Sequence, residues 1–68
     1  MDQIILIEYN WMRGYLVATP ALERMKKNIA RITSGKPGPD PHYILVDICQ
    51  DEAECKEKMA KLYKELGL

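Results

Sequence analysis

The sequence has no phenylalanine, one tryptophan, one histidine and two cysteines among its 68 residues, and its formal net charge is zero. Ten basic and ten acidic residues balance, so the surplus of positive charge that is typical of nucleic-acid-binding domains is missing. The length predicts one domain, residues 1–68, because single domains begin at about 50 residues. A chain this short buries only about 60% of the surface that its unfolded form exposes. We therefore expect its stability to depend on added support.

Long apolar runs are also missing. The run Ile4-Ile5-Leu6-Ile7 ends at Glu8, whereas a signal peptide needs about 7–15 apolar residues and a membrane span about 20. The sequence therefore predicts a cytoplasmic protein that does not bind a membrane.

The cysteines predict neither a disulfide framework nor a metal site. Cys49 and Cys55 are separated by five residues, a spacing that matches no familiar zinc or redox motif. The single histidine, His42, cannot complete a four-ligand site with them unless carboxylates or a second chain join in. We expect two buried thiols that act as small hydrophobic side chains, and no metal or cofactor.

No catalytic constellation follows from the remaining residues. His42 and Cys49 stand at opposite ends of one expected strand, about 23 Å apart at 3.3 Å per residue. Asp40 and His42 flank Pro41 and are close enough in sequence to touch, but the sequence offers no third group to orient them as an acid–base pair. We therefore predict a protein that is not an enzyme.

Three expected elements precede a proline-rich loop. An isoleucine-rich strand runs from residue 3 to about residue 9, and a second strand follows at 15–19. The four residues 11–14 end in Gly14, which is typical of a hairpin connection. Thr19 and Pro20 then predict a helix start, and one helix face is apolar. Its apolar positions are Ala18, Leu22, Met25, Ile29 and Ile32.

The second half predicts a strand and a helix. Residues 34–41 contain three prolines and two glycines, so neither a helix nor a strand can continue through them. A strand follows at about 43–49. Asp51 is the expected N-cap of the last helix, with Glu54 at the capping-box position and Gly67 as its stop.

The element order β-β-α-β-α predicts a small two-layer α+β domain. We expect a three-stranded mixed sheet with two helices packed on it. The second and third strands are expected to be parallel, joined by a right-handed crossover through the first helix.

One face of this sheet has more apolar side chains than a solvent-facing sheet normally carries. If residues 11–14 form the hairpin tip, Glu8 pairs with Val17, and alternation places two groups of side chains on opposite faces. The second face collects Ile4, Leu6, Tyr15, Val17, Tyr43 and Leu45. A partner would cover it. One helix on each side of the sheet, or a register shifted by one residue, would also account for it.

These observations predict a non-catalytic interaction module that forms a homodimer or docks on a larger protein. The apolar sheet face and the hairpin tip are the expected contact surfaces. The residues predicted to bind the partner are Leu6, Trp11, Arg13, Tyr15, Val17, Tyr43 and Leu45.

The alternative function is nucleic-acid binding. Arg24, Lys27 and Arg31 recur at helical spacing on the polar side of the first helix, and an aromatic hairpin tip can stack on bases. Against it, the zero net charge is a poor electrostatic basis for binding a polyanion, and a basic stripe on a helix is most often simply a solvent-facing surface.

Overall fold

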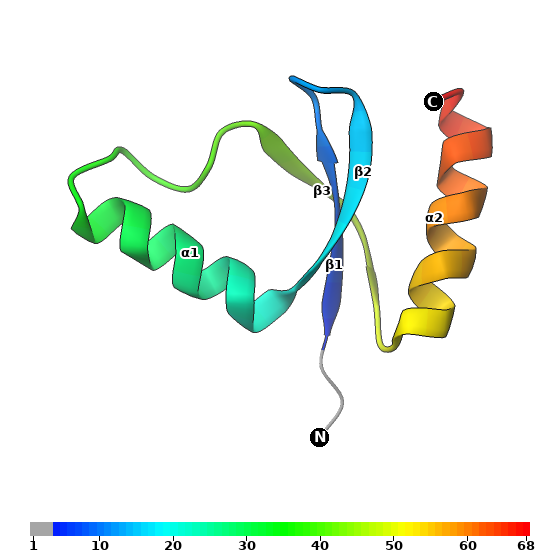
Figure 1. Cartoon of the computed structure of the whole chain (residues 1–68), viewed down its shortest axis with the longest axis horizontal. Coiled ribbons are helices and arrows are strands. Elements are labelled where there is room, and N and C mark those ends of the chain that lie inside the picture. Colours follow the sequence, from blue (N-terminus) through cyan, green and yellow to red (C-terminus); the bar gives the residue numbers. More distant parts are fainter. Residues whose placement is uncertain (1–3) are drawn as a thin grey trace.

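The computed structural model describes residues 4–68, so the expected strand start at Gln3 lies outside the described part. Its elements are β1 (Ile5–Asn10), β2 (Tyr15–Pro20), α1 (Ala21–Thr33), β3 (Tyr43–Cys49) and α2 (Glu52–Leu66). Their order is the predicted β-β-α-β-α, and the α+β class is confirmed (Figure 1).

The hairpin between β1 and β2 has the predicted register. Asn10 pairs with Tyr15 and Glu8 pairs with Val17. The side-chain oxygen of Asn10 accepts bonds from the backbone N–H groups of Met12 and Arg13 at 3.1 and 3.0 Å. Gly14 has a φ of 78°, a conformation that costs glycine little. Local chemistry therefore closes this turn.

The sheet differs from the predicted mixed arrangement. The strand order is β2-β1-β3, and β1 pairs antiparallel with both neighbours. β2 and β3 therefore run in the same direction but do not pair, because β1 lies between them. β2 and β3 are therefore parallel in direction without being hydrogen-bonded neighbours. Both pairs of neighbouring strands, β1 with β2 and β1 with β3, are antiparallel.

The two helices lie on opposite sides of the sheet, so the predicted two-layer packing is not confirmed (Figure 1). α2 packs on all three strands. α1 starts at the end of β2 and runs away from the sheet, and the segment 34–42 returns from its far end to β3. We call α1 together with residues 34–42 the arm.

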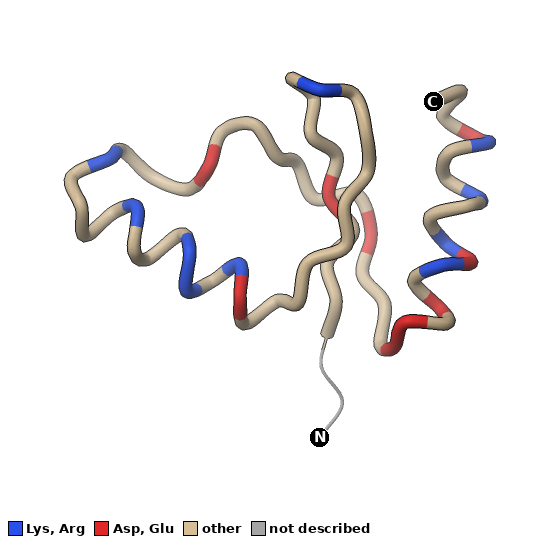
Figure 2. The backbone as a smooth tube through the Cα atoms, viewed as in Figure 1, with Lys and Arg blue, Asp and Glu red and all other residues tan. Residues whose placement is uncertain are grey.

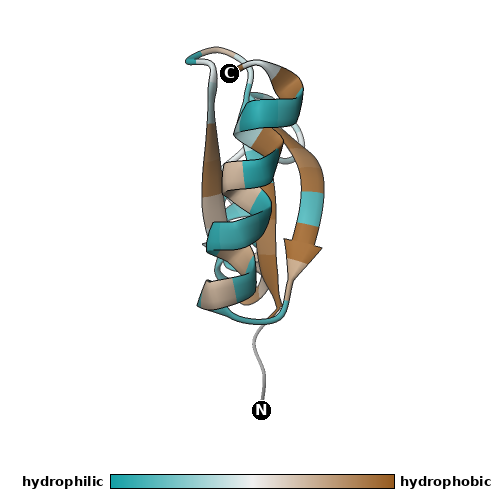
Figure 3. Ribbon diagram, turned by 90° about the vertical axis from the view of Figure 1, so that its right-hand side faces the viewer, coloured by the Kyte–Doolittle hydropathy of each residue, from teal (hydrophilic) through white to brown (hydrophobic). Residues whose placement is uncertain are grey.

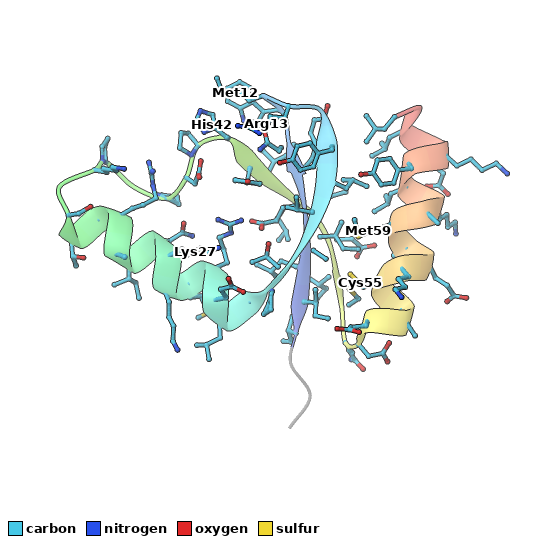
Figure 4. All side chains as sticks on the ribbon, in the orientation of Figure 1. Met12, Arg13, Lys27, His42, Cys55 and Met59 are labelled. Carbon is cyan, nitrogen blue, oxygen red and sulfur yellow. The ribbon has the colours of Figure 1, made fainter. Side chains whose placement is uncertain are left out.

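The core lies between the sheet and α2. Its buried members are Ile7, Leu16, Cys49 and Cys55, of which Ile7 and Cys49 are 0% and 1% exposed. Met59 and Tyr63 of α2 pack against this cluster, and Cys55 and Met59 reach from α2 toward the sheet (Figure 4). The Tyr63 hydroxyl accepts a 3.0 Å bond from the backbone N–H of Leu16. Charged residues cover the outer side of α2, which is largely hydrophilic (Figure 3).

A bulge in β3 interrupts the alternation of its side chains between the two faces. Glu8 pairs with Leu45 but Ile7 pairs with Asp47, so Val46 is an extra residue in β3. A bulge of this kind shifts every later side chain to the other face. Strict alternation from the start of β3 predicts Cys49 on the face of Leu45 and Ile48 on the other face. Because of the bulge, Cys49 instead points into the core and Ile48 points to the opposite face.

The helix starts were predicted with mixed success. At α2 the Asp51 carboxylate accepts a 2.7 Å bond from the Glu54 N–H, as expected. At α1 the predicted cap by Thr19 is wrong, because Thr19 belongs to β2 and Pro20 occupies the N-cap position without a side-chain bond. The Ala21 N–H instead donates to the Ile4 carbonyl at 2.8 Å, so the sheet itself caps this helix.

Across residues 4–68, neither helix combines the length and the apolar character needed to cross a membrane.

The Cys49 thiol should make stability fall at alkaline pH. Burial, reinforced by a hydrogen bond with Cys55, raises the pKa of the Cys49 thiol to about 12, whereas an unfolded cysteine titrates near 8.5. A raised folded pKa means that the contribution is complete below pH ~8.5 and is lost as pH rises toward 12. Between pH 7 and 10 the native chain should lose about 2 kcal/mol more of its free energy of unfolding than a Cys49→Ala variant.

Urea unfolding of both chains at the two pH values measures this difference. An equal loss in the native chain and the variant would show that Cys49 is not protected as the structure has it.

Candidate interaction surface

The sheet face opposite α2 is the candidate surface, and we call it the outer face. Side chains of residues that pair across the strands share a face. The register therefore places three rows there: Thr19, Leu6 and Ile48; Val17, Glu8 and Leu45; and Tyr15, Asn10 and Tyr43. Five of the seven predicted partner-binding residues are in these rows, and Trp11 and Arg13 follow them at the hairpin tip.

The centre of the outer face is polar and buried. Glu8 is only 6% exposed. Its carboxylate accepts a bond from Nε of Arg24 at 3.0 Å and lies 2.9 Å from Nη2 of the same guanidinium. The guanidinium also stacks over the ring of Tyr43 at 4.5 Å from its centroid, a favourable cation–π geometry. Arg24 thus covers the middle of the face and attaches α1 to the sheet.

Apolar side chains surround this polar centre and are uncovered. Leu45 is 61% exposed, Ile48 is 49% exposed and Tyr15 is 38% exposed. Leu6, Val17 and Tyr43 are half-buried. We call Leu45, Ile48 and Tyr15, with Ile4 directly before β1, the apolar rim. The face is therefore a desolvated ion pair bordered by exposed apolar groups.

The hairpin tip contacts the returning end of the arm. Trp11 Nε1 donates a 2.7 Å bond to the Pro41 carbonyl, and the Trp11 backbone N–H donates to the His42 carbonyl at 3.1 Å. The Trp11 and His42 rings are 5.6 Å apart and tilted. Trp11 therefore holds the returning end of the arm while staying 52% exposed. Met12 and Arg13 lie beside His42 at this end of the molecule and are exposed (Figure 4).

Asp40 and His42 touch, as their spacing suggested. Nδ1 of His42 lies 3.1 Å from the Asp40 carboxylate, which also accepts the His42 backbone N–H at 3.0 Å. That backbone bond, with the positive charges of His42, Arg31 and Arg24, lowers the pKa of Asp40. The pair closes the turn around Pro41. Among the described residues, no cluster of three or more histidine, cysteine or acidic side chains could hold a metal.

Of the three basic residues noted on α1, Arg24 and Arg31 are half-buried and Lys27 is exposed. Arg24 is paired with Glu8, Lys27 lies 3.2 Å from Glu23 on the same helix, and Arg31 has a buried Nε atom. All three line a hollow of about 380 Å³ between α1 and the loop, with Asp40 in its wall. Figure 2 shows that the basic residues of the arm follow α1 and its loop, whereas the sheet carries few charges.

Sequence reasoning missed a second apolar surface, on α1. Its apolar positions were expected on the sheet, yet no residue of α1 is buried. The apolar stripe consists of Leu22, Met25, Ile29 and Ile32, which are 57%, 57%, 61% and 53% exposed. The spacing identified the stripe correctly. The signal that the polar side of α1 faces the sheet was Glu8, because an acid in the middle of a strand needs a cationic partner.

Replacing one partner of the Arg24–Glu8 pair should destabilise the fold strongly, and replacing the second partner as well should add little. Arg24→Met or Glu8→Gln alone should cost about 3–5 kcal/mol, because each leaves a buried group without its partner. The double variant should lose less than the sum of the single losses. Urea denaturation of the four chains provides the double-mutant cycle, and strictly additive losses would show that the pair is not coupled.

Comparison with family models, with curated proteins and with solved structures gives no match.

Proposed function

We propose that this protein is a small, non-catalytic interaction module that self-associates through the outer face and the hairpin tip. The observation that carries the proposal is the uncovered apolar rim. Leu45, Ile48 and Ile4 are each about half exposed, although a sheet of this size normally keeps such side chains covered.

The exposed rim leaves unrealised a free energy of burial that is large compared with the stability of so small a chain. Fully burying a leucine or isoleucine side chain contributes about 1.5–3 kcal/mol. Half of that gain is unrealised at each of the three aliphatic rim residues, together about 2–4 kcal/mol. The total stability of a chain of 68 residues is expected to be about 3–10 kcal/mol. Covering the rim would therefore change the stability of this domain substantially.

The chain also exposes more surface than a compact monomer of its mass. The accessible surface is 5144 Å², whereas a compact monomer of this mass exposes about 4,400 Å². A standard interface removes about 800 Å² from each partner. The excess of several hundred Å² is thus of the order that one interface removes.

A second copy of the chain is the occupant that the charges favour. The exposed rim residues carry no charge, and the chain has a net charge of zero, so two copies do not repel each other at long range. Among the described residues in the three outer-face rows, Glu8 is the only acidic or basic one, and Arg24 neutralises it within one copy. Apolar rims of two copies can therefore meet without burying an unpaired charge.

Leu45→Lys should weaken self-association at least about tenfold in Kd, since a lysine in an apolar contact must be desolvated. The matched control is Ile44→Lys, because Ile44 is the next residue of β3, is 52% exposed, and lies on the α2 side of the sheet. Light scattering and sedimentation over a range of concentrations measure the mass, and far-UV circular dichroism checks the fold.

Self-association through this face requires a wild-type mass above one protomer and a larger effect for Leu45→Lys than for Ile44→Lys. The opposite order of effects would place the contact on the α2 side. A folded monomer at every concentration would overturn self-association and leave docking on a larger protein as the way to cover the rim.

A further inference from the structure

We infer that α1 is a dimerisation helix whose apolar stripe, Leu22, Met25, Ile29 and Ile32, packs against the same stripe of a second copy. The inference rests on the proposed self-association and names a contact helix that the outer face does not include. All four side chains are more than half exposed. α1 points away from the sheet, so it is reachable along its length (Figure 1).

The orientation of the stripe is held by the opposite side of the helix. Arg24 is bound to Glu8 at 2.9 Å, and the side-chain oxygen of Asn28 accepts the Asp40 backbone N–H at 3.4 Å. Turning the stripe toward the sheet of its own chain would break both contacts and leave Glu8 buried without a partner. Intramolecular closure is therefore unfavourable, and the stripe is available to another molecule.

The helix also needs an apolar contact to be stable. α1 has 13 residues and none of them is buried. Helices shorter than about 12–15 residues are marginal in water, and in proteins they depend on packing of an apolar face. Its contacts with its own chain lie on the polar side, so the usual source of helix stability is missing from the single chain.

The spacing of the stripe identifies another helix as the surface that fits it. The intervals are three, four and three residues, which places Leu22 and Ile29 at a positions and Met25 and Ile32 at d positions of a heptad. A stripe limited to a and d positions is narrower than the face of a helix packed on a sheet, and it is typical of a helix–helix seam. An uncharged stripe is also complementary to itself, as a two-fold contact requires.

A matched pair of lysine substitutions tests this contact. Ile29→Lys adds one positive charge on the stripe, and Ala30→Lys adds the same charge at the next residue, which is exposed and lines the hollow on the polar side. Ile29→Lys should raise the dimer Kd at least about tenfold and Ala30→Lys much less. Sedimentation equilibrium gives the constants. Because Ile29 is 61% exposed, the circular dichroism of monomeric Ile29→Lys should match that of the wild-type chain diluted to the monomer.

The substitutions Ile29→Lys and Leu45→Lys test the α1 seam and the outer face separately. Loss of association in both Ile29→Lys and Leu45→Lys supports both contacts. Loss in Ile29→Lys alone supports the α1 seam and rejects the outer face. Loss in Leu45→Lys alone, or equal effects of Ile29→Lys and Ala30→Lys, overturns the α1 seam while self-association stands.

Cross-linking gives an independent readout. Ile29→Cys should be joined to a second copy by a short bis-maleimide, whereas Ala30→Cys should react without joining two chains. The native Cys49 and Cys55 are buried and should contribute little under native conditions. Equal yields of cross-linked dimer from the two variants would reject the seam.

Discussion

The ion pair between Glu8 and Arg24 is the contact on which the shape of this molecule depends. Glu8 stands in the middle of the central strand and is only 6% exposed, so it requires a cation. Arg24 supplies it from α1, at 2.9 Å. Because this arginine is on the polar side of α1, satisfying the acid turns the polar side of the helix toward the sheet. The apolar side then points to solvent.

A second polar attachment closes the arm at its other end. The indole N–H of Trp11 donates to the Pro41 carbonyl, and Asp40 and His42 close the turn there. The arm is thus tied near its root by Arg24 and at its return by Trp11. Both ties are polar, and neither buries the apolar stripe. A single chain therefore keeps its core under α2 and leaves two apolar surfaces exposed on the arm side of the sheet.

The small size of the chain explains why only one side of the sheet carries a core. The described chain builds its core from Ile7, Leu16, Cys49 and Cys55 with the partly buried residues around them, and α2 covers this core, although Ile44 on the same side of the sheet stays 52% exposed. The other side has a desolvated ion pair in place of a second core. A partner that covers the apolar rim and the stripe would supply the burial that 68 residues cannot supply alone.

The sequence by itself determined the local elements: the hairpin register, the N-cap by Asp51 and the spacing of the apolar stripe all follow from interactions between residues near one another in the chain. Three features were decided only by the tertiary structure. β1 lies between β2 and β3 and pairs with both. An extra residue, Val46, moves Cys49 into the core. The partner of Glu8 comes from 16 residues away. A periodic pattern shows that a helix has two faces, but which face meets the sheet depends on whether a buried charge elsewhere must be neutralised.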